Sequence, residues 1–165
     1  MVEVRGFSES VRTALESAGW SADRQIDIDG WVSELAAQGY EIDVVVDRAL
    51  RSFGGILVEP VNVTGPNFSN DEPLNVDPIL AGSGHFELAR QLTAELGGNW
   101  FPFGEWLSYS SLFVENSGWT VATGMDWIWD VGPSVEEAIE FALMAHRPLT
   151  CLETLTPGVK PWPRQ

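Results

Sequence analysis

Three segments in the first part of the chain carry apolar residues at helical spacing. These residues are Val11, Leu15 and Ala18 in the first segment, Trp31, Val32 and Leu35 in the second, and Val46, Ala49, Leu50 and Phe53 in the third. Ser8 and Asp43 can cap the first and third segments, because their side-chain oxygens accept hydrogen bonds from first-turn amides. Glycines at positions 19, 39 and 54 follow the three segments and favour helix ends. We therefore predict three short amphipathic helices.

Between residues 56 and 98 the pattern changes twice. Ile56-Leu57-Val58 is apolar and partly β-branched, and Pro60 closes it, so we predict a short strand. Residues 62–78 are dense in Gly, Pro, Asn and Asp, which predicts mostly loop with one short strand near Phe68. Residues 86–96 return to helical spacing, with leucines four positions apart and a glycine pair after them.

The second half of the chain has the pattern of a β-meander followed by a helix. Four β-rich runs cover residues 100–103, 111–115, 119–123 and 127–131. Residues 116–118, Asn-Ser-Gly, are typical of a hairpin connection. Pro102 indicates an edge strand or a bulge, because proline donates no hydrogen bond to a ladder. Ser134 and Glu137 form a capping box that opens the last predicted helix.

This order of elements predicts an α+β fold in one domain. The chain has 165 residues, 44% of them hydrophobic, which is enough for a sizeable core. We assign residues 1–150 to the domain and residues 151–165 to a C-terminal tail. The tail contains three prolines and few aliphatic residues after position 155, so we expect it to lie on the surface or to fray.

The charge of the chain narrows its possible partners. Twenty-four acidic residues face nine basic ones, which gives a formal net charge of −15. Such a field repels nucleic-acid phosphates and anionic membranes, and it speeds encounters with basic partners. Acidity also aids solubility, so it excludes partner classes better than it identifies one. We expect no nucleic-acid partner and no membrane partner.

Cysteine content and the N-terminal segment bear on the cellular location. Cys151 is the only cysteine, which excludes an intrachain disulfide and a cysteine-cluster metal site. Residues 1–10 contain no apolar run of signal-peptide length, and no stretch approaches about 18 uninterrupted apolar residues. We therefore expect a cytoplasmic protein.

The sequence contains no recognisable catalytic or metal-binding motif. His85 and His146 are far apart in sequence and belong to no metal-binding pattern. Residues 82–85, Gly-Ser-Gly-His, do not follow a strand as a nucleophile elbow would. The chain also lacks phosphate-binding glycine loops. We predict no catalytic residue, no metal site and no cofactor.

Eight tryptophans are many for this length. They fit two interpretations, a core between sheet and helices, or an exposed aromatic surface that binds protein or stacks on sugars. We expect Trp106 and Tyr109 to be exposed, because they lie in a predicted connection and loops often carry function. In the run 127–131 the two tryptophans point to one face and the flanking aspartates to the other. The candidate partner-binding residues are Glu105, Trp106, Tyr109, Asp126, Trp127, Trp129 and Asp130.

Four ordered segments carry a family resemblance. They are Ala18-Gly19-Trp20 followed by Arg24 and Ile26-Asp27, then Leu50-Arg51-Ser52-Phe53-Gly54-Gly55-Ile56, then Pro102-Phe103-Gly104-Glu105, and finally Ser134-Val135-Glu136-Glu137-Ala138-Ile139. In this order and spacing they resemble the third subgroup of the SUKH superfamily, over about residues 7 to 145. Each motif is short, and the glycines within them have structural roles.

The resemblance implies a mixed, mostly antiparallel curved sheet flanked by helices. It also implies an immunity protein that neutralises a cognate bacterial toxin, polymorphic or contact-dependent and often a nuclease, by stoichiometric binding. An acidic inhibitor could occupy the basic surface of such a toxin. Two alternatives stay open: a carbohydrate- or small-ligand-binding module or hydrolase with a Trp-rich groove, and a regulatory protein-interaction domain.

Overall fold

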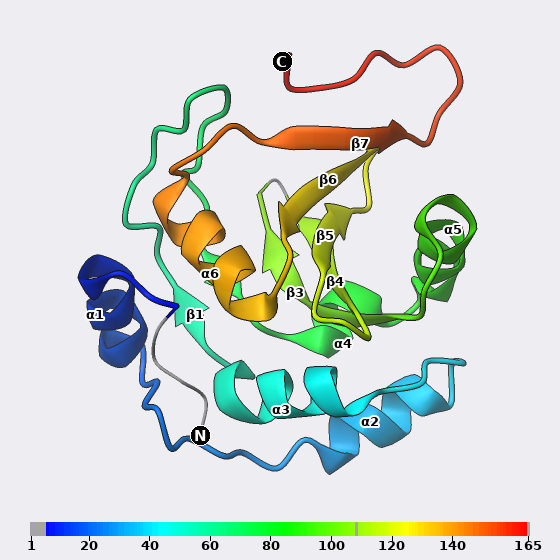
Figure 1. Cartoon of the computed structure of the whole chain (residues 1–165). Coiled ribbons are helices and arrows are strands. Elements are labelled where there is room, and N and C mark those ends of the chain that lie inside the picture. Colours follow the sequence, from blue (N-terminus) through cyan, green and yellow to red (C-terminus); the bar gives the residue numbers. More distant parts are fainter. Residues whose placement is uncertain (1–5, 108, 165) are drawn as a thin grey trace.

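A seven-stranded antiparallel sheet organises the computed structural model, which describes residues 6–107 and 109–164 (Figure 1). The helices of this part are α1 (Glu9–Ser17), α2 (Asp29–Ala36), α3 (Val44–Phe53), α4 (Pro78–Gly82), α5 (Phe86–Leu96) and α6 (Val135–Met144). The strands are β1 (Leu57–Val58), β2 (Leu74–Asn75), β3 (Trp100–Trp106), β4 (Ser110–Glu115), β5 (Thr120–Thr123), β6 (Trp127–Gly132) and β7 (Thr150–Thr154). Strand order follows chain order, and each neighbouring pair is antiparallel. The predicted α+β class is confirmed.

Side chains cap the helices where the sequence predicts it. Ser8 accepts a hydrogen bond from the Val11 amide, and Asp43 accepts one from the Val46 amide. The Ser134 hydroxyl accepts from the Glu137 amide at 3.2 Å and lies 3.2 Å from the Glu137 carboxylate. These contacts satisfy amides that have no partner within their own helix. Helices α1, α3 and α6 therefore begin where local sequence signals place them.

Helix α4 was not predicted: it begins at the last residue of the predicted loop 62–78 and ends before the helix predicted from residue 86. The Asp77 carboxylate accepts hydrogen bonds from the amides of Ile79 and Leu80, both at 3.0 Å, and Pro78 occupies the first helical turn. A helix of this length carries no full period of apolar residues, so pattern analysis misses it. Gly82 at its end packs directly on Pro102 of β3, where a side chain would collide with the proline ring.

A bulge in β3 sets the position of the residues that follow it. The register with β4 shifts between Pro102 and Gly104. The strand lies between β2 and β4, so Pro102 marks the bulge and not an edge. A Cβ at Gly104 would overlap the carbonyl oxygen of Asn75, which makes glycine necessary for the approach of β2. Asn75 then pairs with Glu105, the next residue of β3.

Two segments of the sheet differ from the sequence prediction. The strand expected near Phe68 is only an isolated bridge between Thr64 and Ser69, and the strand of this region is β2. Residues 150–154 form β7, which pairs with β6, although most of them lie in the segment assigned to the tail. The division into domain and tail at residue 150 stays a prediction.

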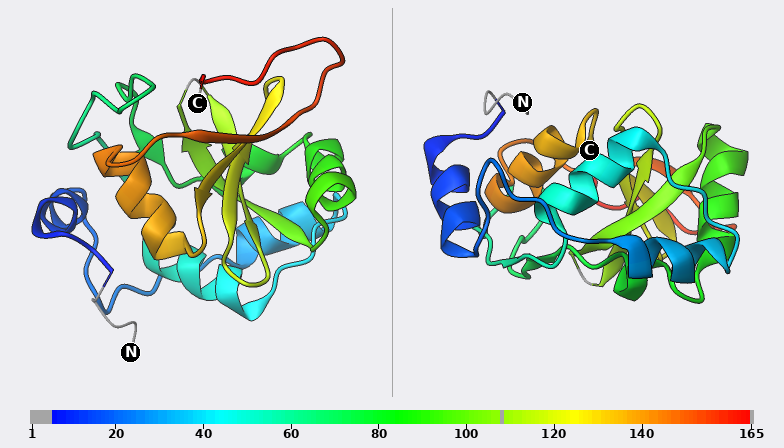
Figure 2. Two further views of the ribbon diagram at one scale, coloured as in Figure 1. Left: turned by 45° about the horizontal axis from the view of Figure 1, so that its top comes forward. Right: turned by 90° about the horizontal axis from the view of Figure 1, so that it is seen from below.

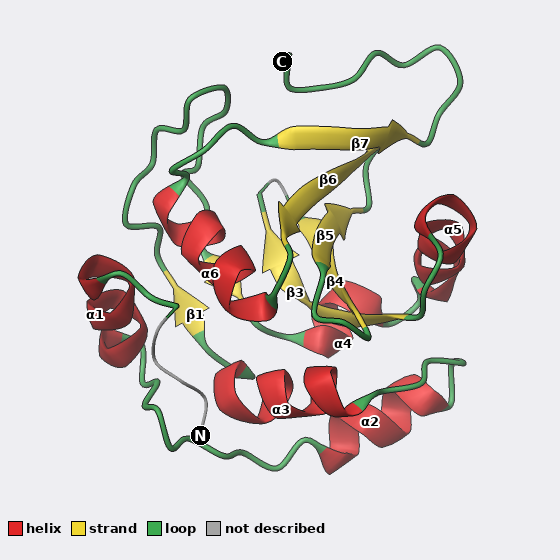
Figure 3. Cartoon of the chain, viewed as in Figure 1, coloured by secondary structure: helices red, strands yellow, loops and turns green. Residues whose placement is uncertain are grey.

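Helices cover both faces of the central strands (Figure 2 and Figure 3). On one face, Phe103 and Leu112 share an internal space with residues of α6. On the other, Pro102 packs on α4, and the Ser111 hydroxyl donates to the Ala81 carbonyl at 2.8 Å. Strands β3, β4 and β5 are consequently buried at nearly every position.

The loop before β2 is tied to α6 and β3 by one buried side chain. Asn70 is 0% exposed. Its Nδ2 donates to the carbonyls of Ala142 at 2.8 Å and Asn62 at 3.1 Å, and its Oδ1 accepts from Trp106 Nε1 at 3.0 Å. Neighbouring amides of residues 61 and 62 donate to the Leu143 carbonyl. The loop thereby satisfies carbonyls at the C-terminal end of α6 that have no partner in the helix.

We expect Asn70→Ala to destabilise the protein by about 2–4 kcal/mol, because it leaves the indole N–H of Trp106 and the Ala142 carbonyl buried without partners. Urea unfolding followed by fluorescence measures the change. Gln91→Ala, at an exposed position of α5, is the control and should change stability little. A loss below about 1 kcal/mol for Asn70→Ala would show that other groups replace its bonds.

Candidate partner-binding surface

A groove lies beside the bulge of β3, where β1, β2 and the turn after β3 meet. It has a volume of about 210 Å³. Its lining residues, which we call the Glu105 groove, are Leu57, Glu72, Pro73, Asn75, Glu105, Trp106 and Tyr109. Three of the candidate binding residues, at positions 105, 106 and 109, are thus brought together in one concave surface. Clefts at which several elements converge are common binding sites.

Trp106 forms part of this groove but is not exposed as predicted. Its side chain is 1% accessible. Besides its bond to Asn70, the indole packs edge-on against Phe68 at 6.0 Å and against Phe141 at 5.8 Å between ring centroids. The expectation of exposure was wrong because these partners lie far away in sequence. Trp106 acts as a rigid support for its neighbours.

Tyr109 is the most exposed large side chain near the groove. It is 81% accessible, as expected for a binding residue in a turn, and Leu57 across the groove is 56% accessible. Leu107 and Tyr109 both have positive φ, 47° and 63°. Non-glycine residues adopt this conformation at a cost, and such strain concentrates at functional sites. The Ser110 hydroxyl holds the turn by donating to the Leu107 carbonyl at 2.8 Å.

The electrostatics of the groove centre on Glu105. Partial burial raises the pKa of its carboxyl group, and the negative charges of Asp77 and Glu72 raise this pKa further, whereas His85 lowers it. The ion pairs among the described residues join Arg51 to Asp29 and Asp47, and Arg90 to Glu87, so none involves Glu105. The groove therefore combines negative charge with exposed apolar and aromatic surface.

The other candidate residues lie on and beside β6, which β4 and β5 separate from β3. Trp127 and Trp129 share one face, as predicted, with their rings stacked at 5.8 Å and 18°. Trp129 is buried and Trp127 half-buried, because residues 155–164 of the same chain cover them. Asp130 accepts a hydrogen bond from Trp119 Nε1 at 3.1 Å, and Asp126 accepts one from the Thr156 hydroxyl at 2.7 Å. The seven candidate residues thus form two separate groups.

Half of the eight tryptophans are buried in the core. Trp20, Trp100, Trp106 and Trp129 are buried, and of the remaining four only Trp162 is exposed. The interpretation of the tryptophans as core residues is therefore confirmed for half of them. Across residues 6–107 and 109–164, no three His, Cys, Asp or Glu side chains gather as metal ligands. Within the same ranges, no helix has the length and apolar character needed to span a membrane.

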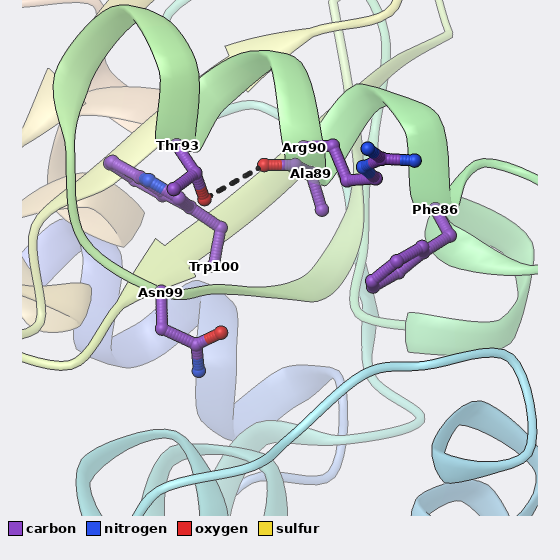
Figure 4. A pocket seen from close by; sticks show the side chains of 6 residues that line it. All are labelled: Phe86, Ala89, Arg90, Thr93, Asn99 and Trp100. Carbon is purple, nitrogen blue, oxygen red and sulfur yellow. Dashed lines mark hydrogen bonds between the residues drawn. The ribbon is translucent and has the colours of Figure 1, made fainter.

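A second hollow lies between α5 and the start of β3 (Figure 4). It has a volume of about 180 Å³, and its lining residues are Phe86, Ala89, Arg90, Thr93, Asn99 and Trp100. Its polar groups bond within the protein: the Thr93 hydroxyl bonds to main-chain carbonyls at 3.2 and 3.0 Å, and Asn99 Nδ2 donates to the Glu41 carbonyl at 3.0 Å. Arg90, also in the lining, pairs with Glu87 of the same helix at 3.5 Å.

Sequence analysis missed four residues that line the Glu105 groove. They are Leu57, Glu72, Pro73 and Asn75. They come from β1, β2 and the segment before β2, which meet only through sheet pairing. No local pattern marks them as a site, because their proximity depends on contacts between segments distant in sequence.

Comparison with known proteins adds one finding. Residues 7–144 match the family model described as SUKH-3 immunity protein, which confirms the resemblance inferred from the ordered motifs. Neither the curated proteins nor the solved structures gave a significant match. The family match covers the Glu105 groove and ends before β7.

The raised pKa of Glu105 predicts a pH-dependent effect on stability. An acid whose pKa is raised on folding binds its proton more tightly in the native state, so native stability falls as the pH rises from its unfolded to its folded pKa. We expect Glu105→Gln to raise the unfolding midpoint at neutral pH, and this gain to vanish below the unfolded pKa, at about pH 4. The matched control, Glu153→Gln on β7, removes an exposed charge. An equal gain for both variants would contradict the assignment.

Proposed function

The chain belongs to the SUKH-3 immunity protein family, and from this premise we propose that it neutralises a cognate bacterial toxin by forming a stoichiometric complex with it. The observation that carries the proposal is the family match over residues 7–144. The toxin is of the polymorphic or contact-dependent kind. The immunity protein needs no catalytic step, because binding to the active surface of the toxin is enough to inhibit it.

The Glu105 groove is the proposed contact surface. Tyr109 and Leu57 offer exposed ring and aliphatic area at its rim. Such side chains are frequent energetic centres of interfaces because they bury large areas at low entropic cost. Glu105 adds a carboxylate that pairs with no cation among the described residues. The groove is therefore complementary to a basic side chain flanked by apolar surface.

The charge of the whole chain supports a basic toxin, and within that class a nuclease. A nuclease carries basic surface to hold phosphates, so a protein with a net charge of −15 can compete for that surface. Long-range attraction would speed association, and apolar contacts would slow dissociation. Because a nuclease attacks intracellular nucleic acid, we place the complex in the cytoplasm.

The predicted binding residues Asp126, Trp127, Trp129 and Asp130 have a secondary place in this proposal. Two of them are engaged by the C-terminal segment through their indole groups, and the aspartates accept hydrogen bonds within the protein. They would meet a toxin only if these internal contacts changed. The first contact is therefore assigned to the Glu105 groove.

Purified protein should bind the toxin domain encoded next to it, with an association rate that falls as salt rises. Tyr109→Ala should weaken binding about 30-fold, the equivalent of about 2 kcal/mol for loss of a central aromatic contact. Glu105→Gln should reduce the affinity and flatten the salt dependence. Surface plasmon resonance measures both rates, and co-expression with the toxin measures protection.

The control for this experiment is Glu153→Gln, which makes the same charge change on β7, at the opposite end of the sheet order. It should leave affinity nearly unchanged. If it weakens binding as much as Glu105→Gln does, the contact surface is misplaced. If the neighbouring toxin does not bind and co-expression gives no protection, the proposed function itself is wrong.

A further inference from the structure

The C-terminal strap, defined here as residues 155–164, returns along the sheet after β7 (Figure 1). It contains no helix or strand, yet it is held at several points. The Leu155 amide donates to the Asp126 carbonyl at 2.7 Å, and Asn67 Nδ2 donates to the Arg164 carbonyl at 3.3 Å. The family match ends at residue 144, so the strap lies beyond it.

The hydrogen-bond donors on β6 and the acceptors on the strap have the same spacing along their segments. Trp127 Nε1 donates to the Lys160 carbonyl at 2.8 Å, and Trp129 Nε1 donates to the Trp162 carbonyl at 2.7 Å. Donors two residues apart on a strand thus meet carbonyls two residues apart on the strap. Both carbonyls belong to residues that precede a proline, Pro161 or Pro163. The two prolines restrict the backbone of the strap next to both of these carbonyls.

The ring of Trp162 also packs on the two tryptophans of β6, so the site contacts a side chain of the strap as well as its carbonyls. The Trp162 ring lies against Trp129 at 5.5 Å and against Trp127 at 5.9 Å between centroids. Pro163 beside it is buried, whereas Trp162 stays 40% accessible. Aromatic side chains that pack on a proline-containing segment are a recurrent means of peptide recognition.

We propose that the Trp127–Trp129 face of β6 is a peptide-binding site for a Lys-Pro-Trp-Pro segment, and that residues 160–163 of the same chain are its occupant. The site recognises two carbonyls two residues apart and one aromatic ring between prolines. The strap is held mainly through side chains that bond to its carbonyls, without ladder pairing, so it binds as a ligand does and exchanges with the same segment supplied in trans. This inference is independent of toxin binding.

Cys151 provides a specific reporter for occupancy of this site. It is the only cysteine of the chain. It pairs with Trp129 across β6 and β7, beneath the strap. Burial raises the pKa of its thiol, and main-chain hydrogen bonds from the strap residue Trp162 act in the opposite direction. Removal of the strap would expose the thiol and increase its reaction with alkylating reagents, because the thiolate is the nucleophile.

The experiment uses the full chain with Trp162→Ala and measures alkylation of Cys151 by iodoacetamide at fixed pH. We expect at least a tenfold faster reaction than in the unaltered chain. A synthetic peptide of residues 156–164, added at millimolar concentration to match the effective concentration of a tethered segment, should restore slow alkylation. The same peptide with Trp162→Ala should not restore it. The unaltered chain should react slowly with or without peptide.

A second variant keeps the test decisive if Trp162→Ala perturbs folding. Trp127→Phe retains a ring but loses the donor to the Lys160 carbonyl, and it should increase alkylation several-fold with an unchanged circular dichroism spectrum. Gln91→Ala, at an exposed position of α5 outside both surfaces, is the control and should leave the rate unchanged. The proposal is overturned if Trp162→Ala and Trp127→Phe both remain folded and react at the original rate, or if the peptide fails to protect Cys151.

Discussion

The buried amide of Asn70 joins three parts of the chain that would otherwise have no reason to meet. It satisfies a carbonyl at the end of α6, a carbonyl of its own loop and the indole N–H of Trp106 on β3. A buried polar group without such partners is costly, so the arrangement is specified closely. Because these contacts fix the side chain of Trp106, the end of β3 and the turn after it are held in a defined position. The shape of the Glu105 groove depends on the fixed position of Trp106.

Irregular backbone produces the proposed contact surface. The bulge at Pro102 and Gly104 lets β2 approach, and two left-handed residues after β3 expose Tyr109. The carboxyl group of Glu105 is then placed where burial and neighbouring acids oppose its ionisation. Such a group lowers stability at neutral pH while it offers an attractive position for a cation. Binding sites commonly combine these opposite effects.

Aromatic residues serve two different purposes in this protein. Trp20, Trp100 and Trp106 are buried in the core, where their size and N–H groups fix neighbours in place. Trp127, Trp129 and Trp162 instead form a contact between β6 and residues 155–164, which lie beyond the family match. The first group builds the core, and the second group holds the C-terminal segment against one face of β6.

The sequence alone determined the features that depend on neighbours a few residues apart. Helix caps at Ser8, Asp43 and Ser134, the α5 segment and the ordered family motifs are all read from local spacing, whereas Pro102 fitted an edge strand as well as the bulge that the strand order shows. Only the tertiary structure decided that Trp106 is buried, that β7 joins the sheet and that the strap covers Trp127 and Trp129. Each of these depends on partners tens of residues away, such as Asn70 for Trp106 and residues 160–162 for β6. Local patterns show which residues are able to be buried, whereas contacts between distant segments determine which of them are buried in the folded protein.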